Sequence, residues 1–116
     1  MPKRNELVAR PKAPSGWTIK FGTTEAANGY EALCEQAEAA TATAYDAITA
    51  NPRSHTNPGK HHRLAGKLAS RSFKEKDLEQ WQYEVTSAGR IWYVIDDANL
   101  TVWLVAASVG HPKKTE

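Results

Sequence analysis

The residues best suited to chemistry are concentrated between Asn51 and Lys76. This stretch carries seven Lys and Arg residues, one acid and three of the four histidines of the chain. The stretch before it, from Phe21 to Pro52, has five acids and no Lys or Arg. Cationic side chains bind phosphate oxygens, and imidazole exchanges protons near neutral pH. This segregation of charge favours a polyphosphate partner, with RNA as the leading candidate. The residues concerned are Arg53, Lys60, Arg63, Lys67, Arg71, Lys74 and Lys76, with His55, His61 and His62.

Three groups suffice to cut RNA without a metal ion. A base takes the proton from a 2′-hydroxyl, a cation stabilises the charge that grows on the phosphorus centre, and an acid protonates the leaving 5′-oxygen. Histidine suits either proton transfer, and the forked guanidinium of arginine suits the cation. The sequence has no His, Cys and Asp cluster with the spacing of metal ligands, so we expect no metal and no other cofactor.

Composition predicts one small domain. The chain has 116 residues, 41% of them hydrophobic, and a formal net charge of +2, so the distribution of charge is more informative than its sum. A single cysteine, Cys34, excludes an internal disulfide and fits a reducing cytoplasm. No apolar run approaches the roughly 18 residues of a membrane span, so we expect a cytoplasmic protein with no membrane partner. We expect residues 1–15 to be a flexible basic arm, 16–112 the domain and 113–116 a short tail.

The first half of the domain predicts a strand and then helix. Trp17–Phe21 alternates between two glycines, which is typical of a short strand. Thr23 or Thr24 can cap a helix that ends at Asn51-Pro52. Its apolar stripe stays in phase, which allows one long helix, although residues 40–43 are a weak point where a second helix could begin. The stripe consists of Tyr30, Leu33, Cys34, Ala37, Thr41, Ala44, Tyr45 and Ile48.

The second half predicts a loop and then a meander of strands. Prolines, glycines and polar residues predict a loop over 51–63. Alternating segments separated by turns then predict about four antiparallel strands, with Trp81, Tyr83 and Val85 on one face. The predicted strands are Leu68–Phe73, a strand around Trp81–Val85, Arg90–Asp96 and Leu100–Val109. The fold class is therefore α+β, with helices packed on one face of a twisted sheet.

The segment GRIWYVIDDANLTVWLVAASVGH, from Gly89 to His111, resembles the C-terminal half of RelE/ParE-superfamily toxins from bacterial toxin–antitoxin pairs. In those toxins an arginine precedes a strand of the form LVY-x-ID, and the last strand ends near SVG. The layout of Asn51-Pro52 before Arg63-Leu64-Ala65-Gly66 also matches. The resemblance extends from Trp17 to His111. It implies an N-terminal strand, a helical hairpin rather than one long helix, and a four-stranded antiparallel sheet.

The resemblance also implies roles for individual residues. Arg90 matches the strand arginine that stabilises the scissile phosphate in RelE-like ribonucleases, and His111 matches the C-terminal histidine of YoeB-like members. Gln82 and Glu84 stand where RelE has lysines, so the acid–base set must differ. We take Arg90 as the phosphate stabiliser and His111 as the general acid, with Glu84, His61 or His62 as the base. Candidate RNA-binding residues are Lys60, Arg63, Lys67, Arg71, Lys113 and Lys114.

Two activities occur in this superfamily, and the sequence leaves both open. RelE-like members cleave mRNA in the ribosomal A site, which would give this chain mRNA, ribosomal RNA and a cognate antitoxin as partners. ParE-like members instead inhibit DNA gyrase without chemistry of their own. The histidines favour the first activity, and the missing RelE lysines favour the second. An inactive RNA-binding relic is a third, weaker alternative.

Overall fold

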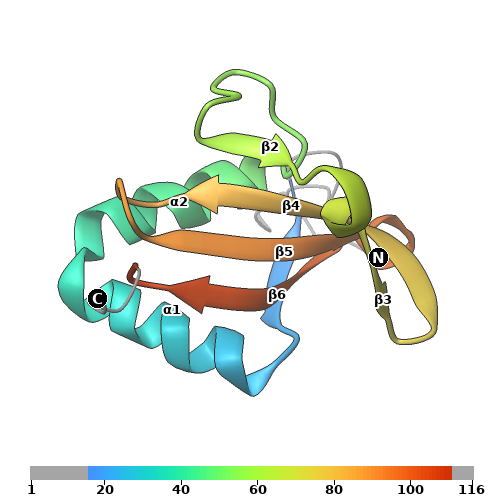
Figure 1. Cartoon of the computed structure of the whole chain (residues 1–116), viewed down its shortest axis with the longest axis horizontal. Helices are drawn as coiled ribbons and strands as arrows, with labels where there is room; N and C mark the ends of the chain where they lie inside the picture. The colour runs from blue at the N-terminus through green and yellow to red at the C-terminus, as the bar shows by residue number, and fades with distance from the viewer. Residues whose placement is uncertain (1–15, 111–116) are drawn as a thin grey trace, which may run out of the picture.

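The computed structural model describes residues 16–110, which form two helices and a mixed sheet (Figure 1). The α+β fold expected from the sequence is confirmed. In chain order the elements are β1 (Thr18–Phe21), α1 (Thr24–Gln36), α2 (Glu38–Ala50), β2 (His61–Arg63), the 3₁₀ turn η1 (Gly66–Ala69), β3 (Ser70–Phe73), β4 (Lys76–Glu84), β5 (Arg90–Asp96), the 3₁₀ turn η2 (Asp97–Asn99) and β6 (Thr101–Ser108).

The sheet is larger than the expected antiparallel meander, and it is mixed. Its strand order is β1-β6-β5-β4-β2, with β3 paired to the first half of β4. The strands β4, β5 and β6 form the antiparallel meander, whereas β1 runs parallel to β6. Residues 61–63, expected to be loop, form β2 at the other edge. The strand expected over Leu68–Phe73 begins only at Ser70, because Gly66–Ala69 forms the 3₁₀ turn η1.

The helical region is a hairpin, as the resemblance implied, but it breaks at Ala37 and not at residues 40–43. Ala37 leaves the helical conformation, with φ −148° and ψ 61°. The hydroxyl of Thr41 donates to the carbonyls of Leu33 (3.1 Å) and Ala37 (2.8 Å), which also accept from the backbone amides of Ala37 and Thr41, and so adds a side-chain bond across the break between α1 and α2. The apolar stripe continues across the break, which is why periodicity alone does not reveal it.

Helix α1 lies unusually close to β6. A Cβ on Gly29 would lie 1.8 Å from the carbonyl oxygen of Ala107, so only glycine fits there. The Thr23 side chain caps α1 by accepting from the Ala26 amide (3.0 Å), and its hydroxyl donates to the Val105 carbonyl (2.9 Å). Val105 is the extra residue of a β-bulge, because Trp92 pairs with Ala106 and Tyr93 with Leu104.

The core lies between the helices and one face of the sheet. The expected inward set is confirmed: Trp81, Tyr83 and Val85 are buried on β4 and the residues just after it. They join Ile91, Tyr93 and Ile95 of β5, Val102 and Leu104 of β6, and Leu33, Ala44 and Ile48 of the helices. None of the described helices is long and apolar enough to cross a membrane.

Candidate active site on the open face of the sheet

The opposite face of the sheet, here called the open face, carries the alternate residues of each strand. Strand register places His62, Gln82, Trp92 and Ala106 in one row across β2, β4, β5 and β6. The next row consists of Glu84, Arg90 and Ser108. Residues in register on neighbouring strands share a face and have closely spaced side chains, so the open face brings these polar and aromatic groups together.

Arg90 lines a cavity of about 400 Å³ at the end of this face, here called the Arg90 groove. Residues of the β4–β5 turn and the end of β6 line it, together with Glu25 from the first turn of α1. Its other lining residues are Gln82, Ala88, Trp92, Ala106, Ala107, Ser108 and Gly110. The close approach of α1 to β6 at Gly29 therefore helps to shape the groove.

The guanidinium of Arg90 is held by backbone carbonyls and not by an acid. Its Nη1 lies 3.3 Å from the carbonyl oxygens of Ser87 and Gly89 and 3.5 Å from that of Thr86. No carboxylate within residues 16–110 forms an ion pair with it. Pairing with Asp96 would be the ordinary structural role of such an arginine, but Asp96 lies at the far end of β5 beside Lys76. Arg90 thus keeps a positive charge available to an anion.

Trp92 forms the aromatic part of the groove. It alternates with the fully buried Tyr93 and so faces away from the core. Its indole Nε1 donates to the side-chain oxygen of Gln82 (2.8 Å), which fixes the ring across two strands. An oriented aromatic ring beside a cation can stack on a base while the cation binds phosphate.

Glu84 and His62 share the open face with Arg90. Glu84 is half-buried, stands opposite Arg90 on β4, and is joined to β2 by its backbone amide, which donates to the Lys60 carbonyl (2.7 Å). His62 lies one row away on the edge strand, and its Nδ1 donates to the Arg63 carbonyl (3.0 Å). That bond leaves Nε2 of the neutral ring as the acceptor.

His61 does not reach this face. Its ring is buried among Trp81, Tyr83 and Tyr93, and its Nε2 bonds the Pro52 carbonyl (3.2 Å) and the Tyr93 hydroxyl. Burial lowers the pKa of His61, with the hydrogen bond to Pro52 acting in the opposite direction. The structure therefore gives this residue a place in the core, where it anchors the loop after α2.

The cationic stretch is not one continuous surface. Arg53 forms hydrogen bonds with both oxygens of Asp97 (2.9 and 2.8 Å) and with Glu79 (2.9 Å). The hydrogen bond to Asp97 is the chief cause that raises the pKa of Arg53 further above its ordinary value. Arg53 thus connects the loop after α2 to β4 and η2, and its charge is already matched.

The side chains of the candidate RNA-binding cations differ in how far other groups of the chain already engage them. Arg63 donates to the Ala69 carbonyl (2.9 Å) and the Ser70 hydroxyl (3.1 Å), and Arg71 donates to the Gln80 side chain (3.3 Å). The ammonium of Lys60 lies over the ring of Tyr83, 5.9 Å from its centroid. Lys67 is exposed on η1. The structure therefore gathers none of these four around Arg90.

The expected acid, His111, lies outside the described residues, as do Lys113 and Lys114. The described chain ends at Gly110, which lines the Arg90 groove. Within residues 16–110, no three His, Cys, Asp or Glu side chains come together in a way that could hold a metal ion.

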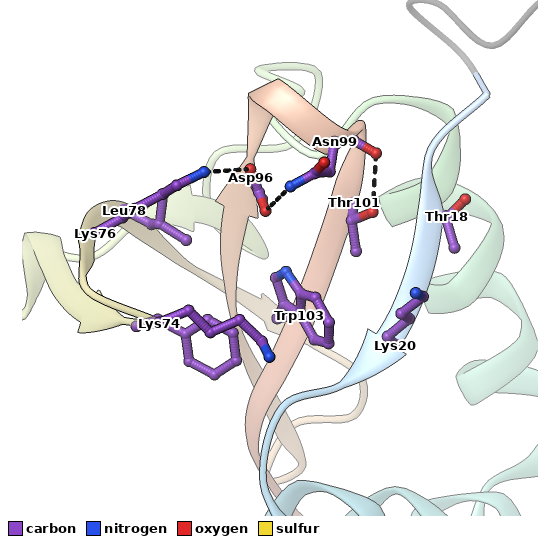
Figure 2. Close-up of a pocket in the computed structure, with 10 residues that line it drawn as sticks. Thr18, Lys20, Lys74, Lys76, Leu78, Asp96, Asn99, Thr101 and Trp103 are labelled. Carbon is purple, nitrogen blue, oxygen red and sulfur yellow. Dashed lines mark hydrogen bonds and ion pairs between the residues drawn. The ribbon is translucent and has the colours of Figure 1, made fainter.

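Sequence reasoning missed a second cavity on the open face, here called the Trp103 pocket (Figure 2). It measures about 640 Å³ and is lined by Thr18, Lys20, Phe73, Lys74, Lys76, Leu78, Asp96, Asn99, Thr101 and Trp103. These residues come from β1, the β3–β4 hairpin, β5, η2 and β6. No spacing in the sequence brings Lys20 to Trp103, because their contact depends on the parallel pairing of β1 with β6.

The fold resembles solved toxin–antitoxin structures. The RelBE2 toxin–antitoxin complex of Mycobacterium tuberculosis contains a chain that superposes with a TM-score of 0.53 at 18% identity, over 80% of this chain and 90% of that one. The archaeal RelE–RelB complex of Pyrococcus horikoshii gives a TM-score of 0.57 at 11% identity, over 87% of this chain and 99% of that one. No protein-family model matches the sequence, and no curated protein sequence does. The chain therefore has the fold seen in RelE complexes, as the resemblance in its sequence implied.

Proposed function

We propose that this chain is the toxin of a toxin–antitoxin pair and acts as an endoribonuclease on mRNA in the ribosome. The RelE fold supports the toxin role, since the RelBE2 structure is a toxin–antitoxin complex and the archaeal structure is a RelE–RelB complex. The observation that carries the enzymatic proposal is Arg90, an arginine without a carboxylate partner among the described residues, beside the fixed ring of Trp92 in a groove.

The proposed reaction is attack of a 2′-hydroxyl on the adjacent phosphorus. A base takes the hydroxyl proton as the O2′–P bond forms, and the P–O5′ bond breaks as an acid gives its proton to O5′. The products are a 2′,3′-cyclic phosphate and a 5′-hydroxyl. Side chains can supply every proton and charge that this sequence of events needs.

Arg90 is the proposed stabiliser of the phosphorane, because its fork can bind two equatorial oxygens at once. The carbonyls of the β4–β5 turn orient it before substrate arrives. Preorganised charge of this kind contributes about two to three powers of ten in rate. Trp92 is the proposed stacking surface for a base next to the cleaved bond.

Glu84 is the proposed base and His111 the proposed acid. Glu84 stands directly across the ladder from Arg90, which suits a group that must reach the 2′-hydroxyl of a phosphate bound there. His62 is the alternative base, since its Nε2 is a hydrogen-bond acceptor. It lies one row away from Arg90 and two strands away across the sheet. His61 is no longer a candidate because it is buried on the other face. His111 is the next residue in the sequence after Gly110, which lines the groove.

The proposed partners are a cognate antitoxin and the translating ribosome. The cations outside the groove, Lys60 and Lys67 among them, would contact ribosomal RNA, as would Lys113 and Lys114. Such contacts to phosphate position a protein without reading sequence. Cleavage by the free protein is therefore expected to be much slower than cleavage on ribosomes.

Inhibition of DNA gyrase without RNA cleavage is the second candidate function. The observation that favours it is the pair Gln82 and Glu84 on the open face, since a nuclease groove usually carries more cations than the single Arg90 found among its described lining residues.

Induced expression in a bacterial host without the antitoxin separates the two functions. The nuclease predicts an immediate loss of protein synthesis, with DNA supercoiling intact. Gyrase inhibition predicts relaxed DNA and an SOS response, while message remains uncut. The Arg90→Ala variant should no longer cause the loss of protein synthesis.

A further inference from the structure

The Trp103 pocket is separate from the Arg90 groove, since none of its lining residues also lines that groove. Three ammonium groups and one carboxylate face it, and the carboxylate is Asp96. Figure 2 shows Lys20 on one side of the indole ring of Trp103 and Lys74 on the other. The pocket therefore carries a net positive charge that the proposed chemistry at Arg90 does not use.

Two of the lysines converge on a single ring. The Nζ of Lys74 lies 5.0 Å from the ring centroid of Trp103, and the Nζ of Lys20 lies 5.5 Å from it. Attraction between a cation and an aromatic face holds such ammonium groups in place. Neither lysine forms an ion pair with a carboxylate of residues 16–110. With three lysines and one aspartate in its lining, the pocket has a positive electrostatic potential.

Asp96 does not neutralise this pair, because its carboxylate is already engaged. Lys76 approaches one oxygen (3.8 Å), and the side-chain amide of Asn99 donates to the other (2.8 Å). Burial raises the pKa of Asp96, but the hydrogen bond from Asn99, the neighbouring indole of Trp103 and the charge of Lys76 outweigh it, so its pKa is lowered and the group is ionised at neutral pH. The positive charge that remains belongs to Lys20 and Lys74.

The wall that carries Lys74 is fixed by the fold. Phe73 pairs with Lys76, so Lys74 and Glu75 form a two-residue turn, and both have positive φ (51° and 67°), as a type I′ turn requires. The Phe73 ring packs on Gly22, where an added Cβ would lie 2.9 Å from it. It also contacts Trp103, with ring centroids 5.3 Å apart. Because the site is preorganised, binding loses little conformational entropy.

We propose that the Trp103 pocket binds the phosphate group of a nucleotide, with the phosphate oxygens attracted by the ammonium groups of Lys20 and Lys74 that flank the Trp103 ring. A phosphomonoester carries close to two negative charges at neutral pH, which matches the excess of two positive charges that three lysines and one aspartate give the pocket. A carboxylate carries one charge in one plane and would leave one lysine unpaired. The volume of about 640 Å³ exceeds what inorganic phosphate needs and suits a nucleotide, whose base can contact the aromatic wall.

This inference goes beyond the proposed function and does not depend on it, since RNA cleavage would occur in the other cavity. The phosphate could belong to a free mononucleotide or to the 5′ end of an RNA chain. Both present the same chemistry to the two lysines.

The test is a titration followed by NMR on the indole N–H signals, with the Trp103 signal assigned by loss in Trp103→Phe. Ligands are a nucleoside monophosphate, a 5′-phosphorylated trinucleotide, the same trinucleotide with a 5′-hydroxyl, and a short acidic peptide. Each is added to the wild-type chain, to the double variant Lys20→Gln/Lys74→Gln, and to Lys67→Gln. The last variant removes one exposed charge from η1, outside the pocket.

We expect the two phosphorylated ligands to shift the Trp103 signal in the wild type and in Lys67→Gln. The double variant should bind them at least tenfold more weakly. Tighter binding of the mononucleotide would identify a free nucleotide as the ligand, and tighter binding of the 5′-phosphorylated trinucleotide an RNA end. Binding of the acidic peptide alone, or equal binding by the double variant, would overturn the proposal. Arg90→Ala should bind as the wild type does, even if the chain cleaves no RNA.

Discussion

Arg90 and Glu84 stand opposite each other across the β4–β5 ladder on the open face, yet no ion pair joins them. Opposite charges in such positions usually attract. Here the guanidinium instead turns to the carbonyls of the β4–β5 turn. A cation and a carboxylate held side by side but not neutralising each other are what a phosphate stabiliser and a base require.

Replacing Arg90 by alanine should lower the rate of RNA cleavage by about two to three powers of ten, because the phosphorane loses its only described counter-charge in the groove. The rate is measured on programmed ribosomes. Glu35→Ala, which removes an exposed charge from α1, is the control and should keep the activity. Both variants should unfold within about 0.5 kcal/mol of the wild type in urea, so a loss of activity in Arg90→Ala alone would not be a loss of fold.

Glu84→Gln should reduce kcat while leaving KM nearly unchanged, since the amide fits the same place but takes no proton. The pH–rate profile of His62→Gln should match that of the wild type. If His62→Gln instead removed the pH dependence of the rate near neutral pH, and Glu84→Gln remained active, His62 would be the base.

His61 should make stability depend on pH. Burial lowers its pKa in the folded chain, so the unfolded chain binds the proton more tightly. Stability should therefore be full above the ordinary histidine pKa of about 6.5 and decline as pH falls below it. His61→Phe should remove this decline, as measured by urea unfolding between pH 5 and 8, and unchanged pH dependence would contradict the assignment.

The Arg53 network should contribute in a more acidic range. The hydrogen bond from Arg53 lowers the pKa of both Asp97 and Glu79. Their contribution is therefore present above the unfolded pKa values of about 4 and is lost as pH falls through the lower folded values. Arg53→Gln should cost about 1 kcal/mol at pH 7, since the pair is partly exposed and screened. The cost should shrink on acidification, and a cost that grows below pH 4 would refute this account.

Gly29→Ala should destabilise the chain by about 2 kcal/mol or more, because the new methyl group meets the Ala107 carbonyl. Gly59→Ala is the matched control. A Cβ there would meet only the Asn57 side-chain oxygen at 3.9 Å, so stability should change little. Urea unfolding of both variants measures the difference. Equal stability of the two would mean that α1 can move away from β6 at no cost.

Local patterns predicted local structure well. The strand over Arg90–Asp96 has the bounds expected from its alternation, and the inward residues of β4 were identified for the same reason. The outward position of Trp92 also follows from alternation with Tyr93. These features depend on neighbours in the sequence, which periodicity reports directly.

Features that depend on distant partners could not be predicted in this way. The helix break at Ala37 is stabilised by the hydroxyl of Thr41. In the sequence, Thr41 is only one more small residue of the apolar stripe. His61 appeared as a loop residue among cations, because its burial depends on Pro52 and Tyr93. The pairing of β1 with β6 creates the Trp103 pocket from residues more than eighty positions apart. The sequence around Lys20 has no feature that predicts this pairing.

The most direct test of the central claim is to map the 5′ ends of mRNA after the purified protein acts on ribosomes paused at a known codon. We expect cuts inside the A-site codon with the wild-type chain, 5′-hydroxyl ends on the downstream fragments, and no cuts with Arg90→Ala. Uncut message with the wild-type chain, or equal cutting by the variant, would contradict it.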